Sequence, residues 1–333
     1  MSNAAIQIEH LYKNFEIRKP ASGIWAGLKN IVSPQIETVE AVKDLSFSIE
    51  RGERVAFVGQ NGAGKSTTIK MLSGILHPSA GNIHVLGLNP SQQRSELAYK
   101  IGTVFGQRSQ LWYHLPAKDT FELLSYAYDM DRAEFNSRIK MLVDSFDIGD
   151  LLDQPVRQMS LGQRMRCEIV ASLLHKPEVL FLDEPSIGLD VTAKATIRSL
   201  IREASEQDGT TVLLTSHDTG DMEQVCERVM IIDFGQLITD CPVHELRSKT
   251  LHKRVITFHL REGLEELPKL EGMTIQRQDH EVLVVEIDTR INGTDHVIQS
   301  VLDHARVSDI RIEDIPMEDI IQSIYTNAQE ALA

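Results

Sequence analysis

The spacing of apolar residues predicts alternating strands and helices up to about residue 245. Buried strands are predicted where apolar residues run almost without interruption, at Val55–Val58, Glu178–Leu182 and Thr210–Thr215. Helices are predicted where apolar residues recur every three or four positions, as they do after Gly64 and after Ser160. Strands that alternate with helices are typical of a parallel sheet covered on both faces, so we expect an α/β fold.

The pattern changes after about residue 245. Strands are predicted there at residues 254–260, 281–287 and 307–312, and helices at residues 294–305 and 316–325. This order of elements favours a small α+β domain. A chain of 333 residues has room for two domains, which we place at residues 1–245 and 246–333.

Two segments add to the α/β pattern. An insertion at about residues 16–38 contains a predicted helix with one apolar side, formed by Ile24, Trp25, Leu28, Ile31 and Val32. That side has three possible partners, namely its own domain, a membrane subunit or the lipid interface. The second segment, about residues 108–158, has helical periodicity and the length of a helical subdomain.

Charge and composition exclude several classes of protein. The chain has 34 Lys and Arg against 48 Asp and Glu, a net charge of −14, so we expect no nucleic-acid partner. Its three cysteines lie far apart without metal-ligand spacing, which disfavours disulfides and zinc. Because no apolar run approaches the ~18 residues of a spanning helix, we expect a chain that does not itself cross a membrane.

The segment that joins the first predicted strand to its helix has the pattern of a phosphate-binding loop. Such a loop needs glycines so that backbone N–H groups can approach phosphate oxygens closely. A lysine reaches the outer phosphates, and a following hydroxyl binds Mg²⁺. The chain supplies these groups in the order Gly59, Asn61, Gly62, Gly64, Lys65, Ser66 and Thr67. We therefore predict a nucleoside-triphosphate site.

Two adjacent carboxylates follow the predicted strand at residues 178–182. Asp183 and Glu184 stand at the carboxyl end of a buried strand, where charged groups are costly unless a cation or a polar task holds them. Mg²⁺ on Asp183 and a water molecule held by Glu184 meet that need.

The order of motifs along the chain resembles the nucleotide-binding subunit of an ABC transporter. After the phosphate loop come Gln107, Met159–Gln163, Leu182–Pro185, Gly188–Asp190 and Ser216-His217. The resemblance extends over about residues 6–245 and implies a P-loop NTPase fold that hydrolyses ATP with Mg²⁺. Soluble ABC proteins of translation or DNA repair are the alternative of another class, but those carry two phosphate loops or long coiled coils.

The resemblance also implies roles for single residues. Glu184 polarises the attacking water, Gln107 approaches the water and Mg²⁺, and His217 contacts the γ-phosphate. Phe15 stacks on adenine, although Tyr12 on the same predicted strand is an alternative. Asp190 lies near the seam of a dimer.

The segment around Ser160 is identified by resemblance as the signature of the family, although the commonest form has Gly where this chain has Leu161. Ser160, Gly162 and Gln163 lie at a predicted helix N-terminus, which is an anion site. In the family, this segment covers the ATP that a partner subunit holds. The resemblance therefore implies a dimer, which is either a homodimer or a heterodimer.

The final predicted helix, the insertion and the segment from Phe105 to Trp112 are similar to those of drug- and antibiotic-export ATPases. The resemblance implies a separate integral membrane permease and a place at the cytoplasmic face of the cell membrane. Trp112 and Tyr113 are candidates for the surface that grips the permease. A polysaccharide or lipid exporter is the nearest alternative.

Overall fold

The computed structural model describes residues 3–18, 36–106, 109–248, 252–261 and 270–332. The chain divides into two compact units, Met1–Val243 and His244–Ala333, and each is considered by itself. Within the ranges just given, no helix has the length and apolar character needed to cross a bilayer.

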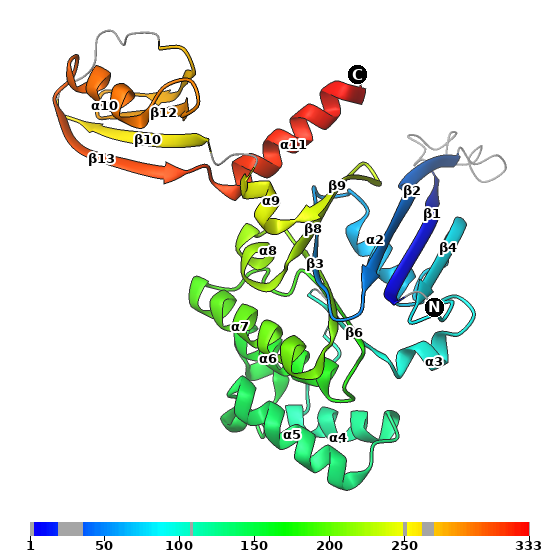
Figure 1. Cartoon of the computed structure of the whole chain (residues 1–333). Coiled ribbons are helices and arrows are strands. Elements are labelled where there is room, and N and C mark those ends of the chain that lie inside the picture. The colour runs from blue at the N-terminus through cyan, green and yellow to red at the C-terminus, as the bar shows by residue number, and fades with distance from the viewer. Residues whose placement is uncertain (1–2, 19–35, 107–108, 249–251, 262–269, 333) are drawn as a thin grey trace, which may run out of the picture. The chain divides into compact units, whose positions relative to one another are not determined.

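A six-stranded sheet forms the centre of the first unit (Figure 1). Its strands stand in the order β5 (Ile101–Phe105), β6 (Val179–Asp183), β7 (Thr211–Ser216), β3 (Arg54–Gly59), β8 (Arg228–Asp233) and β9 (Gln236–Pro242). All neighbouring pairs are parallel except β8 and β9. The carboxyl ends of β5, β6, β7 and β3 therefore meet at one edge of the sheet.

A second, antiparallel sheet contains β2 (Ile36–Glu50), β1 (Ala4–Arg18) and β4 (Ala80–Val85). Helix α2 (Lys65–Leu72) lies between the two sheets (Figure 1). One apolar cluster joins α2 to both sheets and includes Phe57, Ile69 and Ile83. The helix after the phosphate loop is thus held on both sides by buried contacts.

The structure corrects the predicted limits of the insertion. Residues 16–18 and 36–38 belong to the β1–β2 hairpin, in which Glu16 pairs with Thr38 and Arg18 with Ile36. Glu16, Ile17, Glu37 and Thr38 are exposed, and only one of these four side chains is apolar, so their strand character was not visible in the apolar pattern. The predicted helix around Ile24 to Val32 lies outside the described residues.

Helices complete the first unit. They are α3 (Arg94–Ala98), α4 (Ala117–Ala127), α5 (Arg132–Phe146), α6 (Leu161–Leu173), α7 (Val191–Asp208) and α8 (Thr219–Val225), with short 3₁₀ turns at Gly149–Leu151 and Val156–Gln158. Both α4 and α5 pack against α6. The buried guanidinium of Arg138 on α5 donates to both carboxylate oxygens of Asp208 at the end of α7, at 3.1 and 2.5 Å.

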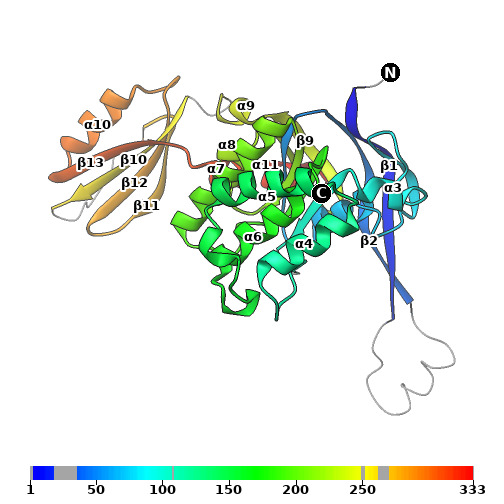
Figure 2. The same cartoon turned by 90° about the horizontal axis from the view of Figure 1, so that it is seen from below.

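The second unit is α+β, as the sequence predicted. Its antiparallel sheet has the order β11 (Met273–Gln278), β12 (Val282–Asp288), β10 (Lys253–Leu260) and β13 (Val307–Asp314). Helix α10 (Thr294–Leu302) covers one face, where Val297 and Val301 join the apolar core (Figure 2). Two further helices, α9 (Val243–Ser248) and α11 (Met317–Leu332), lie before and after these elements in the sequence.

Candidate functional site

A cleft of about 480 Å³ opens at the edge where β3, β5, β6 and β7 end. Its lining includes residues that follow all four strands, which are Asn61, Ser66, Lys70, Ile75, Phe105, Gly106, Asp183, Glu184, Ile187 and His217. Ligands of open α/β sheets bind outside the carboxyl ends of the strands, so the position of the cleft is that of a ligand site.

The loop between β3 and α2 has the backbone that a phosphate cradle requires. Gly64 caps α2 with φ of +103°, and a Cβ atom there would lie 2.5 Å from the carbonyl oxygen of Ala41. Only glycine fits both conditions. The α2 N-terminus therefore opens towards the loop with its free N–H groups, which is a favourable place for a phosphate.

Lys65 is held inside this loop. Its ammonium group donates to the carbonyl oxygens of Gly59 at 2.6 Å and Gln60 at 3.1 Å, and the residue is 5% exposed. Burial lowers the pKa of Lys65, while the nearby carboxylates of Glu184 and Asp183 act in the opposite direction. A buried cation that faces two carboxylates marks the site as one for highly charged ligands.

Asp183 at the end of β6 is bound by two hydroxyl groups. Ser66 Oγ donates to Asp183 Oδ1 at 3.0 Å, and Thr215 Oγ1 donates to the same oxygen at 2.6 Å. A serine hydroxyl beside a carboxylate is a set of hard oxygen donors, which is the chemistry that Mg²⁺ prefers. The pair predicted to bind magnesium is therefore brought together.

Glu184 and His217 face each other at the mouth of the cleft. Glu184 Oε1 lies 2.7 Å from His217 Nε2, with side-chain exposures of 20% and 40%. Glu184 has φ of +54°, and its N–H donates to the carbonyl oxygen of Thr215 at 3.0 Å. A non-glycine residue keeps such a backbone only when its surroundings fix it, a condition found at functional sites.

Gln107 lies outside the described residues, whereas Gly106 before it and Ser109 and Gln110 after it are described. Gly106 N–H donates to the carbonyl oxygen of Asp183 at 2.9 Å. On the other side, Ser109 Oγ and the Gln110 N–H donate to the buried carboxylate of Glu168 on α6. Gly106 is thus anchored to β6, and Ser109 and Gln110 are anchored to α6.

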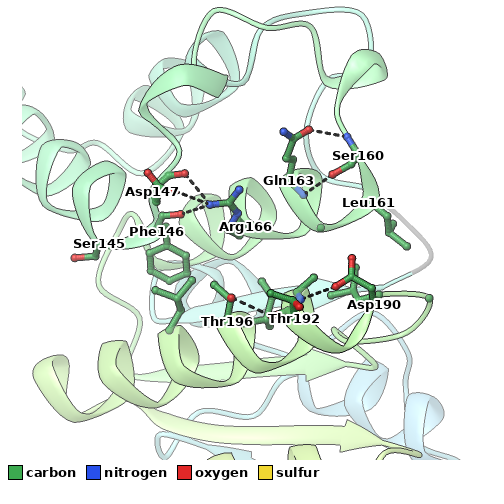
Figure 3. A pocket seen from close by; sticks show the side chains of 16 residues that line it. Ser145, Phe146, Asp147, Ser160, Leu161, Gln163, Arg166, Asp190, Thr192 and Thr196 are labelled. Carbon is green, nitrogen blue, oxygen red and sulfur yellow. Dashed lines mark hydrogen bonds and ion pairs between the residues drawn. The ribbon is translucent and has the colours of Figure 1, made fainter.

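Ser160 caps α6, as predicted. Gln163 N–H donates to Ser160 Oγ at 3.2 Å, and Ser160 N–H donates to Gln163 Oε1 at 2.8 Å, which forms a capping box. Gly162 lies where a Cβ atom would come within 3.3 Å of Ala193 Cβ on α7, so it allows α6 and α7 to pack closely. The side chains of Ser160 and Gln163 lie at the exposed start of the helix (Figure 3).

A second pocket of about 550 Å³ lies beside this helix start (Figure 3). Its lining includes Ser160 to Gln163 of α6, Gly188 to Asp190, and Arg166. Asp190 is exposed and caps α7 through the Ala193 N–H at 2.9 Å. Leu161 packs towards Gly188, at which a Cβ atom would lie 3.0 Å from Leu161 Cδ2.

The structure does not bring every predicted site residue into one place. Among the described residues, the cleft at the strand ends and the pocket beside α6 share no lining residue. Phe15 on β1 is also not part of the cleft lining. It is half-buried, pairs with Val39, and lies below the ammonium of Lys13, 5.0 Å from the ring centre. Its proposed stacking on adenine stays a prediction.

Some residues of the site were missed in the sequence. Thr215 on β7 pairs with Asp183 on β6, and its hydroxyl, which donates to Asp183, also accepts the Glu184 N–H at 3.1 Å. Asp221 on α8 accepts hydrogen bonds from Ser186 and Ser216, which flank Glu184 and His217 in the sequence. Only the position of Thr215 next to Ser216-His217 could have indicated its role, whereas nothing in the sequence indicated Asp221.

Comparison with known proteins gives a consistent result. A family model described as "ABC transporter" matches residues 42–187. The chain is 34% identical over 202 residues to the ABC transporter ATP-binding protein NatA of Bacillus subtilis. The aligned region covers 61% of this chain and 82% of NatA. It is 32% identical over 266 residues to the daunorubicin resistance ATP-binding protein DrrA3 of Streptomyces coeruleorubidus, with coverages of 78% and 83%.

The fold is also similar to that of solved structures. The ATP-binding cassette MJ0796, solved as a dimer in a post-hydrolysis state bound to ADP and phosphate, superposes with a TM-score of 0.60 at 24% identity. The similarity covers 72% of this chain and 98% of that one.

Proposed function

Because the chain belongs to the ABC transporter family and is an ATP-binding ATPase, we propose that it is the energising subunit of an exporter. In this proposal a separate integral membrane permease forms the substrate path, and the chain works at the cytoplasmic face of the membrane. Support comes from the relatives, one of which is named for resistance to daunorubicin.

Different residues of the cleft bind the phosphates of ATP and catalyse its hydrolysis. The loop from Gly59 to Thr67 binds the phosphates through its N–H groups, and the ammonium of Lys65 turns from the loop carbonyls to the outer phosphates. Glu184 orients the attacking water and accepts its proton, while His217 donates to the γ-phosphate. Gln107 completes the shell around the water.

Ser66 and Asp183 would hold Mg²⁺, because their oxygens already lie within 3.0 Å of each other. The ion supplies positive charge that neutralises the phosphate oxygens. Thr215 keeps the carboxylate of Asp183 directed at this position through its 2.6 Å hydrogen bond.

A second copy of an ATPase subunit would complete the site. The signature residues Ser160, Gly162 and Gln163 line a pocket apart from the cleft of their own chain. In a dimer with shared sites, this helix start would instead cover the ATP that is bound in the cleft of the other subunit. Asp190 at the edge of the same pocket would lie at the dimer seam. The dimeric state of the similar cassette supports this arrangement.

The observation that carries the proposed chemistry is the pair of Glu184 and His217, 2.7 Å apart at the mouth of the cleft. Glu184→Gln removes the base and keeps the shape of the side chain. We expect ATP turnover to fall by ~10²-fold or more, because the proton acceptor is lost, while ATP affinity stays within about twofold.

Glu178→Gln is the matched control. Glu178 directly precedes the first residue of β6, at the end of the strand opposite to Glu184, and pairs with Arg51 at the surface. Its variant is expected to hydrolyse ATP at the wild-type rate. Unchanged hydrolysis in Glu184→Gln would contradict the assignment of the base.

The proposed association with a permease is tested by affinity purification of the chain from a detergent extract. Trp112 and Tyr113, about half exposed on the subdomain that contains α4, are the proposed contact surface. We expect an integral membrane protein to co-purify with the wild type and to be reduced with Trp112→Ala. Recovery with ribosomes or DNA, and with no membrane protein, would overturn the transport function but not the ATPase.

A further inference from the structure

We propose that Asp221 is a positioning residue that sets the placement of Glu184 and His217, although it is not part of the cleft lining. The inference rests on the roles proposed for those two residues. Asp221 belongs to α8, is 2% exposed and has no counterpart among the motifs of the sequence.

One oxygen of Asp221 joins the segment after β6, which carries Glu184, to the segment at the end of β7, which carries His217. Asp221 Oδ2 accepts from Ser186 Oγ at 2.5 Å and from Ser216 Oγ at 2.5 Å. Ser186 follows Glu184 by two residues, and Ser216 directly precedes His217. Hydrogen bonds to an ionised acceptor are short and strong, so the two loops are held at a fixed separation.

The other oxygen of Asp221 is bound from α7. Arg198 Nε donates to Asp221 Oδ1 at 2.6 Å, and Arg198 Nη2 lies 2.7 Å from Asp218 Oδ1. The guanidinium packs against Gly220, where a Cβ atom would come within 2.6 Å of Arg198 Nη1. Arg198 is therefore held by two carboxylates and by the backbone of α8.

The ends of this network are also fixed. Lys194 Nζ donates to Asp218 Oδ2 at 2.6 Å. Burial alone would raise the pKa of Asp218, but the hydrogen bond from Lys194 and the charge of Arg198 outweigh it and hold the pKa below its usual value. The carboxylate of Asp218 is thus kept charged, and Arg198 stays paired on both sides.

Stability alone is a poor explanation for such a network. Buried ion pairs are often no more stabilising than apolar side chains of similar size. The network instead meets the needs of Glu184, whose left-handed backbone persists only when neighbouring residues fix it. Ser186 follows Glu184 by two residues, and its hydrogen bond to Asp221 provides such a constraint.

The proposal predicts a separation of turnover from binding. Among the described residues, no hydrogen bond or ion pair joins Asp221 to Lys65 or to the phosphate loop, so ATP affinity should not depend on the network. Glu184 must hold the water in line with the γ-phosphate, and a displacement of about 1 Å at a reacting group costs on the order of 10²-fold in rate. We expect Asp221→Asn to lower kcat roughly tenfold or more while the Kd for ATP changes less than about threefold.

Asp208→Asn is the matched control, because Asp208 binds the guanidinium of Arg138, another buried arginine of the same unit, away from the cleft. Both variants lose a charged partner of a buried arginine, so both should lower the Tm. Only Asp221→Asn should lower kcat. A similar fall of kcat in the two variants would show that lost stability is responsible and would overturn the proposal.

A double variant tests whether Asp221 acts through Glu184. In the Glu184→Gln background, Asp221→Asn should reduce the residual rate by a smaller factor than it reduces the wild-type rate, because one of the two groups that it positions is already lost. Full additivity of the two effects would contradict the proposal. If Asp221→Asn does not fold, the pair Ser186→Ala and Ser216→Ala removes both loop contacts and must give the same fall in kcat.

The two proposals fail in different ways. Unchanged hydrolysis in Glu184→Gln contradicts the proposed base, and the role of Asp221 then fails with it. A large loss in Glu184→Gln together with wild-type kcat in Asp221→Asn overturns only the positioning role.

Discussion

At the scale of the residue, His175 shows how burial fixes one protonation state. His175 Nε2 lies 3.0 Å from the carbonyl oxygen of Ile101, so this nitrogen carries the proton, and the ring stacks on Tyr128 at 3.8 Å. Nδ1 is buried and has no hydrogen-bond partner among the described residues. A second proton would therefore create a buried charge without an acceptor. Burial lowers the pKa of His175 to about 4.

This predicts a loss of stability in acid. The unfolded chain binds the proton near pH 6.5 and the folded chain only near pH 4, so the stability contributed by neutral His175 is complete above about pH 6.5 and falls as the pH decreases. Between pH 7 and pH 5 the loss amounts to roughly 2 kcal/mol.

Denaturant unfolding of the first unit at both pH values checks this prediction. His175→Phe keeps a ring on Tyr128 but cannot titrate, so its stability should depend on pH by roughly 2 kcal/mol less than that of the wild type. His84→Gln, which changes an exposed histidine, should behave like the wild type. Equal pH dependence in His175→Phe and the wild type would contradict the prediction.

Single residues also mark what a sequence can predict about the site. Lys65, Ser66 and Asp183 belong to motifs whose spacing reflects one local geometry, and the structure brings them together. Thr215 and Asp221 act on neighbouring strands and loops, through contacts between residues 32 and 35 positions apart. Such contacts depend on strand order, which the apolar pattern does not encode.

At the scale of the element, the start of α6 combines two roles in Ser160. The hydroxyl caps the helix, and the same side chain is exposed at the pocket proposed to receive the partner's ATP. Aspartate is as good a cap as serine, but its charge would repel a phosphate. Ser160→Asp should therefore keep the free energy of unfolding within about 0.5 kcal/mol and lower ATP turnover at least tenfold.

The matching exchange at another helix provides the control. Asp131 caps α5 by accepting from the N–H groups of Ala133 and Glu134. Asp131→Ser should preserve both stability and turnover, because this helix start does not line the cleft or the pocket. Unfolding curves and steady-state hydrolysis of the two variants test the idea. Wild-type turnover in Ser160→Asp would show that Ser160 is only a cap.

Two of the strand segments that the apolar pattern did not predict have few buried side chains. Strand β11 carries mostly exposed polar side chains at the edge of its sheet, and Glu16, Glu37 and Thr38 of the β1–β2 hairpin are also polar and exposed. An apolar pattern reports burial, and these strands exist through backbone pairing with little burial. Apolar residues continue at helical spacing to Leu76, but α2 ends at Leu72, because Gly74 adopts φ of +71°.

At the scale of the whole molecule, a sequence gives the order of motifs but not the chain in which each motif acts. The phosphate loop and the signature occur in one sequence, yet within one chain they line separate pockets. In the proposed dimer, each ATP is bound by the loop of one subunit and covered by the signature of the other. Lys65→Ala and Ser160→Asp should each lower turnover at least tenfold, since each damages both sites of its own homodimer.

Mixing the two inactive variants should restore hydrolysis. In a heterodimer, one site combines both defects, whereas the other combines an intact phosphate loop with an intact signature. Random pairing of equal amounts makes about half of the dimers mixed, so the specific activity should rise to about a quarter of the wild-type value at most. The rise should require time for subunit exchange and should disappear when both variants also carry Glu184→Gln. If the mixture remains as inactive as its components, each chain hydrolyses ATP with its own residues, and the shared site is wrong.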